Sequence, residues 1–283
     1  MKVYKEKKLI TALLKALKDD QHTIGFVPTM GALHQGHLSL VAQALKHNDY
    51  AVVSIFVNPT QFDNASDLDH YPRTLEADVA LLSTIDTNRI MVYAPSVDDV
   101  YEGNTTSKEF DFDGLEFEME GKFRKGHFNG VGTVVKKLFE IVIPDTAYFG
   151  EKDFQQLAII KKLVEKYQIP VQIVGCEIAR EPSGLAMSSR NTRLKPIYKD
   201  AAPFIYQTLQ TAKRYFGTKS AKEVTEWVQD QFGKHPILKL EYFTIADIET
   251  LKPIKRKSNK KKYRAFIAVY ADEIRLIDNI ALN

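Results

Sequence analysis

The chain has 283 residues, of which 44% are hydrophobic and 27% are charged, so a well-buried core and about two domains are expected. Its single cysteine, Cys176, excludes an internal disulfide and a CxxC metal site. The first residues lack the apolar core of a signal peptide, and no stretch approaches the roughly 20 apolar residues of a membrane span. We therefore expect a soluble, cytoplasmic protein that binds no membrane.

The net charge of +3 depends on one short segment. Residues 252–264, KPIKRKSNKKKYR, contain eight basic residues and no acidic ones, which leaves a net charge of −5 on the rest of the chain. A basic run between two strand-like segments is usually a solvated hairpin loop. We favour that interpretation over a binding site for nucleic acid or another polyanion.

The first two thirds of the chain alternate between helical and strand-like segments. In chain order we expect a helix around 10–17, a strand at 23–28, a helix at 37–47, a strand at 50–59, a helix near 74–86, a strand at 89–95, a helix near 130–142, a strand around 146–149, a helix at 153–167 and a strand at 171–178. This order predicts an α/β fold, with a Rossmann-like, doubly wound parallel sheet.

Two segments depart from that alternation. EFDFDGLEFEME (109–120) has apolar residues at every second position on both sides of Asp113-Gly114, which predicts an inserted β-hairpin. Beyond about residue 185, helical stretches at 197–217 and 220–234 precede three strand-like runs. We expect two domains, residues 1–185 and a smaller α+β domain at 186–283 with a three-stranded sheet.

Four polar clusters follow predicted strands of the parallel sheet. They are PTMGALHQGH (28–37), NPTQF (58–62), GEKDFQQL (150–157) and REPSGLAMSSRN (180–191). Ligands of doubly wound sheets bind at the carboxyl ends of the strands. We therefore expect these loops to converge on one cleft.

His34 and His37 flank Gly36 at the expected start of a helix. The pair could bind zinc, but no HExxH context and no cysteine lies nearby. A helix N-terminus attracts phosphate through its N–H groups, glycine lets a ligand approach the backbone, and imidazoles donate to phosphoryl oxygens. The sequence favours phosphate binding at this position.

Lys152, Ser188, Ser189 and Arg190 also suit a polyphosphate. Each has an ordinary alternative, since Lys152 could be a solvated surface lysine and the serines could be helix caps. However, Lys152 opens a helix, where the dipole disfavours a cation unless an anion is bound. With the two histidines and Mg²⁺, these groups could stabilise charge at a nucleoside triphosphate. The chain has no Walker loop and no GxGxxG, so it is not an ordinary kinase or dehydrogenase.

HxGH on the first crossover with a later MSSRN loop resembles the nucleotidylyltransferase superfamily. The fuller set of motifs resembles the pantothenate synthetase (pantoate–β-alanine ligase) family over nearly all of residues 23–193: PTMGALHQGH, SIFVNPTQF, YPR, EGKFRKGHFNGVGTVV, YFGEKDFQQL and REPSGLAMSSRN. The resemblance implies that pantoate attacks the α-phosphate of MgATP to give pantoyl adenylate and pyrophosphate. The β-alanine amine then displaces AMP.

The resemblance also assigns roles to matching positions. It implies catalytic contacts to the phosphates by His34, His37, Lys152, Ser188, Ser189 and Arg190. It implies further ATP contacts by Met30, Gly150, Asp153 and Met187. It implies pantoate contacts by Met30, Asn58, Gln61, Arg124 and Gln156. Glu120 and Arg124 would belong to a cover loop over the triphosphate, and Asp78 is a weaker candidate for a magnesium contact.

The same resemblance implies a homodimer, Mg²⁺ with ATP as co-substrate, no tightly bound organic cofactor and a C-terminal domain that acts as a lid. Three positions depart from the usual family pattern, namely Lys125, Phe154 and Ser183, and none is a predicted catalytic group. Two other functions would each account for part of the pattern. A nucleotidyltransferase making a dinucleotide product would have no need of NPTQF or GEKDFQQ, and a nucleic-acid-binding protein would use a basic run that lies outside every motif.

Overall fold

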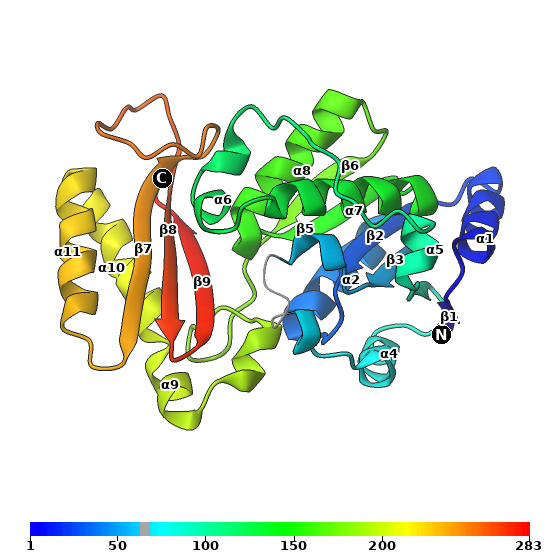
Figure 1. The fold of residues 1–283 in the computed structure, drawn as a ribbon, viewed down its shortest axis with the longest axis horizontal. Helices are drawn as coiled ribbons and strands as arrows, with labels where there is room; N and C mark the ends of the chain where they lie inside the picture. The colour runs from blue at the N-terminus through cyan, green and yellow to red at the C-terminus, as the bar shows by residue number, and fades with distance from the viewer. Residues whose placement is uncertain (63–67) are drawn as a thin grey trace. The chain divides into compact units, whose positions relative to one another are not determined.

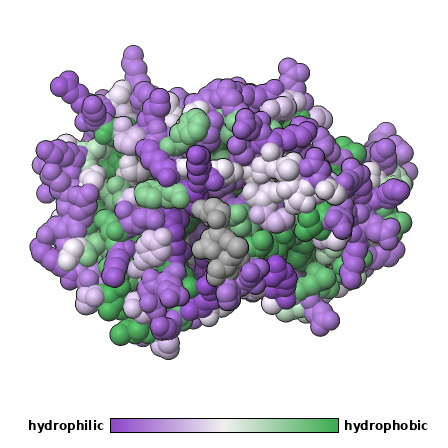
Figure 2. All heavy atoms as spheres, viewed as in Figure 1, coloured by the Kyte–Doolittle hydropathy of each residue, from purple (hydrophilic) through white to green (hydrophobic). Residues whose placement is uncertain are grey.

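A computed structural model describes residues 1–62 and 68–283, which form two compact units (Figure 1). Unit 1 comprises Met1–Glu151 and Gln155–Glu177, and unit 2 comprises Lys152–Phe154 and Ile178–Asn283. Hydrophilic side chains cover most of the face drawn in Figure 2. No helix in the described ranges is long and apolar enough to cross a membrane.

Unit 1 is built on a six-stranded parallel sheet with the order β1-β4-β3-β2-β5-β6. Its strands are β1 (Lys2–Tyr4), β2 (Ile24–Thr29), β3 (Tyr50–Ile55), β4 (Ile90–Tyr93), β5 (Thr146–Gly150) and β6 (Gln172–Cys176). Its helices are α1 (Lys7–Asp19), α2 (Gln35–His47), α4 (Leu75–Ser83), α5 (Val97–Tyr101), α6 (Glu120–Phe123), α7 (His127–Val142) and α8 (Phe154–Tyr167), the last starting at a unit 2 residue.

Helices pack on both faces of this sheet. Val27 of β2 belongs to a buried cluster with Val41 of α2 and Leu82 of α4. The neighbouring Phe26 points to the opposite face, because side chains alternate along a strand, and its ring lies 6.1 Å from that of Phe139 in α7. The predicted doubly wound α/β fold is confirmed.

The strand order places a topological switch point between β2 and β5. The chain proceeds outward from β2 to β3 and β4, and then returns past β2 to β5 and β6 (Figure 1). Loops that follow β2 and β5 therefore leave the same edge of the sheet in opposite directions. These are the loops that contain the HxGH and GEKD motifs.

The predicted hairpin at 109–120 is wrong, because the segment packs on α7 instead of pairing with itself. Phe110 and Phe112 stack with ring centroids 5.5 Å apart, and both rings lie about 3 Å from a Cβ built on Gly132 of α7. The amide of Phe110 donates to Asn129 Oδ1 at 3.1 Å. Alternating apolar residues therefore mark a strap on a helix here, followed by a 3₁₀ helix at Leu115–Phe117 and by α6.

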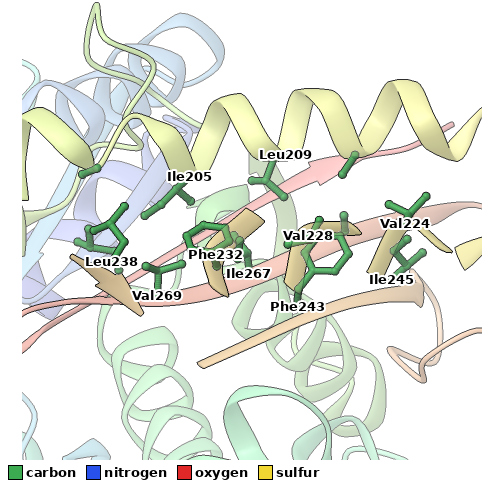
Figure 3. Packing of buried hydrophobic residues seen from close by; sticks show 14 of the residues in the cluster. Ile205, Leu209, Val224, Val228, Phe232, Leu238, Phe243, Ile245, Ile267 and Val269 are labelled. Atoms are coloured by element: carbon green, nitrogen blue, oxygen red, sulfur yellow. The ribbon is translucent and has the colours of Figure 1, made fainter. Parts of the chain in front are cut away.

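Unit 2 contains an antiparallel sheet of β7 (Leu238–Asp247), β8 (Tyr263–Ala271) and β9 (Ile274–Ala281). Its helices are α9 (Pro196–Ala201), α10 (Phe204–Phe216) and α11 (Ala221–Gly233). The side chains of α10 and α11 pack on the sheet around Leu209, Val228 and Ile267 (Figure 3). The predicted helix at 197–217 is divided into two helices at Pro203. Ala202 and Pro203 keep helical dihedral angles, but the proline has no backbone N–H and so cannot continue the helical hydrogen bonds.

The basic run connects β7 to β8 as a hairpin loop. Its lysines and Arg256 are exposed, whereas the last basic residue, Arg264, is buried in β8. Two loop lysines have specific contacts, since Lys261 pairs with Asp247 at 2.7 Å and Lys257 lies over the Phe216 ring at 4.0 Å. The expected solvated hairpin loop is confirmed for residues 252–262.

Candidate active site

The loop after β2 is held in an unusual backbone conformation. Gly31 has φ +83°, and a Cβ built there would lie 3.0 Å from both Asp78 and Ile55. The following Ala32 also has a positive φ, +51°. The carboxylate of Asp78, which is 2% exposed, accepts from the amides of Ala32 and Leu33 at 3.0 and 2.8 Å. This carboxylate fixes the path of the chain into the histidine motif.

His34 and His37 cap the N-terminus of α2 reciprocally. His34 Nδ1 accepts from the amide of Gly36 at 3.1 Å, and His37 Nδ1 accepts from the amide of His34 at 3.2 Å. The ring centroids are 4.1 Å apart. Because each Nδ1 accepts a hydrogen bond, the neutral rings carry their proton on Nε2. The cap therefore sets the tautomer and orientation of two imidazole donors at the positive end of a helix.

Three of the predicted pantoate residues lie in contact with one another. Asn58, which is 1% exposed, donates from Nδ2 to Gln61 Oε1 at 3.3 Å. Gln61 Nε2 in turn donates to Met30 Sδ at 2.7 Å. Tyr101 donates from its hydroxyl to Asn58 Oδ1 at 2.6 Å, and burial raises the pKa of this tyrosine, so it stays protonated. Tyr101 orients Asn58, and Asn58 orients Gln61.

Gln61 is the last residue of a short 3₁₀ helix, Pro59–Gln61, and Arg124 contacts this helix. His127 Nδ1 donates to the carbonyl of Gln61 at 2.8 Å, and Arg124 donates to the same oxygen at 3.4 Å and to His127 Nε2 at 3.3 Å. The close approach of α7 needs Gly130, where a Cβ would lie 2.1 Å from the carbonyl oxygen of Thr60. The structure therefore brings Met30, Asn58, Gln61 and Arg124 together.

The expected cover segment is anchored by a glutamine that the sequence analysis did not single out. Gln155 is 4% exposed, accepts from the amide of Glu120 at 3.0 Å, and donates to the carbonyls of Leu115 and Glu118 at 2.8 and 2.7 Å. Gln156 is half-buried in the same turn of α8. Beside them at the end of β5, a Cβ built on Gly150 would meet no atom within 4 Å.

Lys152 and Asp153 belong to unit 2 although they directly follow β5. They lie in a 3₁₀ helix, Glu151–Asp153, that leads into α8. The ammonium of Lys152 is half-buried and 3.7 Å from the carboxylate of Asp153. The carbonyl of Lys152 accepts from Asn279 Nδ2 at 2.9 Å, so a strand of unit 2 fixes the backbone at this lysine.

The MSSRN segment begins a second short 3₁₀ helix, Ser189–Arg193. Ser188 is its N-cap, and its Oγ accepts from the amide of Arg190 at 3.3 Å. Asn191, which is 7% exposed, donates to Glu181 Oε1 at 2.9 Å and to the carbonyl of Ala186 at 3.1 Å. The asparagine of the motif is therefore an anchor, and Met187 to Arg190 lie on the turn that it holds.

The site residues predicted from the sequence are divided between the two units. Unit 1 contains Met30, His34, His37, Asn58, Gln61, Asp78, Glu120, Arg124, Gly150 and Gln156, and unit 2 contains Lys152, Asp153, Met187, Ser188, Ser189 and Arg190. Sequence reasoning missed the residues that orient them, notably Tyr101, His127, Gln155 and Asn279. Among the described residues, no cluster of three or more His, Cys, Asp or Glu could hold a metal ion by itself.

Comparison with known proteins gives consistent results. The Pantoate-beta-alanine ligase family model matches residues 2–281. The chain is 59% identical to the pantothenate synthetases of Flavobacterium psychrophilum and Christiangramia forsetii over 282 and 283 residues, which is 100% of each chain. It also superposes on pantothenate synthetase from Thermus thermophilus with a TM-score of 0.91 and 38% identity, over 100% of this chain and 99% of the other.

A second solved structure contains ligands. The chain matches pantoate-beta-alanine ligase from Francisella tularensis complexed with beta-gamma ATP and beta-alanine, with a TM-score of 0.80 and 36% identity. The match covers 100% of this chain and 98% of that one.

Proposed function

The chain belongs to the pantoate–beta-alanine ligase family, so it is an acid–amine ligase that makes pantothenate, and we propose the path by which its residues do so. In the first step the pantoate carboxylate attacks the α-phosphorus of ATP, and pyrophosphate leaves. In the second step the amine of β-alanine attacks the acyl carbonyl of pantoyl adenylate, and AMP leaves. The ATP and β-alanine in the Francisella tularensis structure support this choice of substrates.

We propose that His34 and His37 stabilise the charge that develops on the phosphates in the first step. Their reciprocal cap fixes Nδ1 of each ring as an acceptor from the backbone, so the proton of each neutral ring is on Nε2, and an Nε2–H can donate to a phosphate oxygen. The N-terminus of α2 adds its own positive potential. This pair of oriented neutral donors is the observation that best supports the proposed chemistry.

Lys152, Ser188, Ser189 and Arg190 would neutralise the departing pyrophosphate in the same step. A lysine at the start of a helix and a guanidinium beside two hydroxyls are suited to phosphate oxygens. We propose that Gly150 and Asp153 hold the ribose, and that Met187 contacts ATP. The open space beside Gly150 is consistent with a ligand near that backbone.

Pantoate would bind along the Met30–Asn58–Gln61 contact. A glutamine amide can donate to one oxygen and accept from another, which suits a substrate that carries two hydroxyls. Asn58 is buried and already bonded to Tyr101, so it acts by orienting Gln61. We propose that Gln156 and Arg124 complete the pantoate contacts, and that Glu120 and Arg124 belong to a segment that covers the adenylate and limits its hydrolysis.

Asp78 does not fit a magnesium ligand well. Its two oxygens accept from the amides of Ala32 and Leu33 and from Thr74 Oγ1, so a metal would compete with three protein donors. Mg²⁺ commonly binds nucleotide phosphates while keeping several waters. We propose that Mg²⁺ accompanies ATP through its phosphates and that Asp78 positions the loop. A cytoplasmic homodimer and a lid function for the C-terminal domain also remain proposals from the resemblance.

Exchange of labelled pyrophosphate into ATP tests the two-step path. The assay contains Mg²⁺, is run with and without pantoate, and omits β-alanine. We expect exchange only when pantoate is present, because the first step is then reversible and the second cannot occur. If a folded, ATP-binding sample shows no exchange but makes pantothenate when β-alanine is added, reversible formation of the adenylate before β-alanine binds is excluded.

A further inference from the structure

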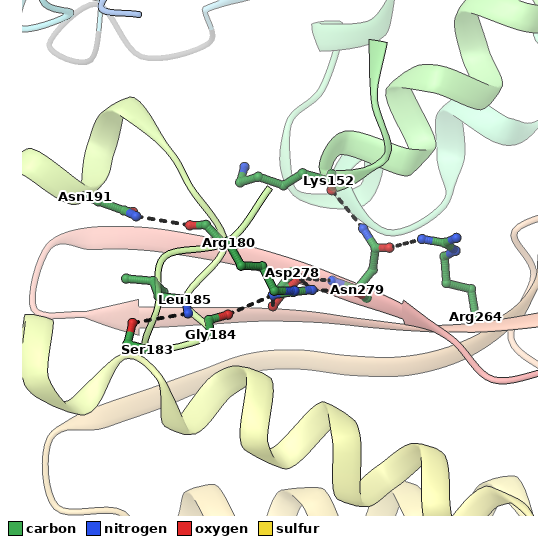
Figure 4. Close-up of polar contacts among 10 residues, drawn as sticks. Lys152, Arg180, Ser183, Gly184, Leu185, Asn191, Arg264, Asp278 and Asn279 are labelled. Atoms are coloured by element: carbon green, nitrogen blue, oxygen red, sulfur yellow. Dashed lines mark hydrogen bonds and ion pairs between the residues drawn. The ribbon is translucent and has the colours of Figure 1, made fainter. Parts of the chain in front are cut away.

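Two adjacent residues of β9 bond to the two segments of unit 2 that contain the proposed phosphate contacts. We propose that Asp278 and Asn279 are positioning residues for the first reaction step, Asn279 acting through Lys152 and Asp278 acting through the turn that leads to Ser188. This inference rests on the proposed function. The contacts are drawn in Figure 4.

Asn279 connects the backbone of Lys152 to the sheet. It is 2% exposed, and its Nδ2 donates to the carbonyl of Lys152 at 2.9 Å. Its Oδ1 accepts from Arg264, and the guanidinium of Arg264 lies 4.2 Å from the ring centre of Phe154. The residues on both sides of Asp153 are thus held by one buried network. In Figure 4 the ammonium of Lys152 points away from this network, as a group that binds a ligand would.

Asp278 holds the second segment. It is 4% exposed and accepts from both terminal nitrogens of Arg180 at 2.6 and 2.9 Å. Arg180 also donates to the carbonyl of Gly184 at 3.1 Å, and its guanidinium stacks 3.6 Å from the ring centre of Tyr206. A bidentate, stacked arginine of this kind has little freedom to move. Arg180 begins the turn that ends at Ser188.

The turn itself is closed by backbone pairing. Arg180 and Ala186 form an isolated β-bridge, and the amide of Met187 donates to the carbonyl of Ala179 at 2.9 Å. Asp278 therefore fixes the base of the turn, from which Ser188, Ser189 and Arg190 follow directly.

The alternation of side chains along β9 explains how two adjacent residues, Asp278 and Asn279, can bond to two different segments of the chain. Side chains of successive residues in a strand point to opposite faces. Leu276 and Ile280 pack into the cluster under α10, so Asp278 lies on that face and Asn279 on the other. Asp278 Oδ1 also accepts from the amide of Asn279 at 2.7 Å. The relative position of Lys152 and the MSSRN turn is thus set by one dipeptide, and small misplacements of catalytic groups are costly.

Asn279→Asp tests the hydrogen bond to Lys152 most selectively. The carboxylate can still accept from Arg264, but it cannot donate to the carbonyl of Lys152. We expect kcat for pantoate-dependent pyrophosphate exchange to fall by ~10-fold or more, while KM for pantoate changes by less than about 2-fold. Asn279→Ala, which removes both hydrogen bonds without adding a charge, should show the same selective loss of kcat.

Glu241→Gln is the matched control. Glu241 forms a half-buried ion pair with Arg275 of β9, whose Nε donates to Glu241 Oε2 at 2.8 Å. The change to Gln weakens this ion pair, which belongs to the same sheet but lies away from Lys152. Exchange by this variant should match that of the wild-type protein. Asn279→Asp should also add no further loss to Lys152→Ala, because both changes act through the same side chain.

The outcomes distinguish failure of the proposed reaction path from failure of the positioning role. Absence of pantoate-dependent exchange in the folded wild-type protein contradicts the proposed reaction path. The positioning role is overturned if the wild-type protein exchanges and the Asn279 variants match Glu241→Gln. It is also overturned if the losses caused by Asn279→Asp and Lys152→Ala multiply, since that would show independent effects.

Discussion

His37 combines two roles that substitution can separate. Its Nδ1 caps α2, and its Nε2 is the proposed donor to phosphate. In His37→Asn the amide oxygen can replace Nδ1 as acceptor, but the distal donor is lost. We expect both His37→Asn and His37→Ala to lose pyrophosphate exchange by ~10²-fold or more. Only the alanine variant should also lose about 1 kcal/mol of stability in urea denaturation, because it loses the cap.

His47→Ala, an exposed change in the last turn of α2, is the control and should keep full exchange. Near-normal exchange in His37→Asn would remove His37 from the mechanism and leave it as a cap alone.

Substitutions at Gln61 and Tyr101 test the series of contacts at the proposed pantoate site. Gln61→Ala should raise KM for pantoate and leave KM for ATP unchanged, since Gln61 is proposed to contact only the acid. Tyr101→Phe removes the hydroxyl that orients Asn58, so it should raise KM for pantoate by a smaller factor, about 3- to 10-fold. Steady-state kinetics with each substrate varied in turn measure both effects. Equal loss of affinity for ATP and pantoate in Gln61→Ala would contradict the assignment.

The sequence indicated the residues with distinctive chemistry better than those that hold them in place. His34, Lys152 and Arg190 stand in motifs whose side chains have clear uses. Gln155 is identical in type to its neighbour Gln156, and only the fold decides that Gln155 is the buried one that anchors residues 35 to 40 positions away. Asn279 donates across 127 positions. Such partners are brought together by tertiary packing, which no local pattern encodes.

At the scale of elements, the loop between β2 and α2 depends on Asp78. Asp78→Asn replaces one acceptor oxygen by an NH₂ that faces a backbone N–H, so we expect a loss of about 1–3 kcal/mol in the free energy of unfolding without any ligand. Exchange should fall as well. Glu76→Gln, exposed in the same turn of α4, is the control. A variant with unchanged stability but a higher Mg²⁺ requirement would instead identify Asp78 as a metal contact.

His235 should make the stability of unit 2 depend on pH. The centre of its ring lies 4.8 Å from that of Phe204 and 6.5 Å from that of Phe232, its Nδ1 accepts from the amide of Leu238 at 3.0 Å, and burial lowers its pKa. The stabilising effect is therefore complete above the ordinary pKa of about 6.5 and is lost as the pH falls below it. We expect the Tm to drop more between pH 7.5 and 5 in the wild-type protein than in His235→Asn, which keeps an acceptor. Equal drops would contradict this account.

Most elements of the sheet were predictable because buried parallel strands are continuous apolar runs, as in β3 and β4. The error at 109–120 arose because a period-two pattern marks any extended segment with one buried side. Phe110 and Phe112 are buried against α7, and the backbone of Phe110 bonds to Asn129 instead of to a strand. Whether an extended segment finds a strand or a helix as its partner depends on its tertiary neighbours.

At the scale of the whole molecule, the chain leaves unit 1 twice. Lys152–Phe154 belongs to unit 2 although β5 precedes it and most of α8 follows it in unit 1, and the chain passes to unit 2 again at Ile178. All the residues proposed to bind pantoate lie in unit 1, whereas Lys152 and the MSSRN turn lie in unit 2. The proposed reaction therefore needs groups from both units, which is why changes in the sheet of unit 2 are expected to alter the first step.

The basic loop determines the sign of the net charge of the whole protein. Lys255, Arg256, Lys260 and Lys262 are exposed, and changing all four to Gln lowers the net charge from +3 to −1. Lys257 and Lys261 are kept because they contact Phe216 and Asp247. Exposed changes of this kind should alter stability by less than about 0.5 kcal/mol.

We expect kcat/KM for pantothenate formation to be unchanged in this fourfold variant at physiological salt, because long-range attraction of ATP to the loop is screened beyond about 8 Å. Neither protein should bind duplex DNA or RNA under those conditions. Binding by the wild-type protein that weakens steeply with salt and disappears in the variant would show a polyanion site at the loop. An unchanged rate together with that binding would assign the basic loop a role separate from the ligase reaction.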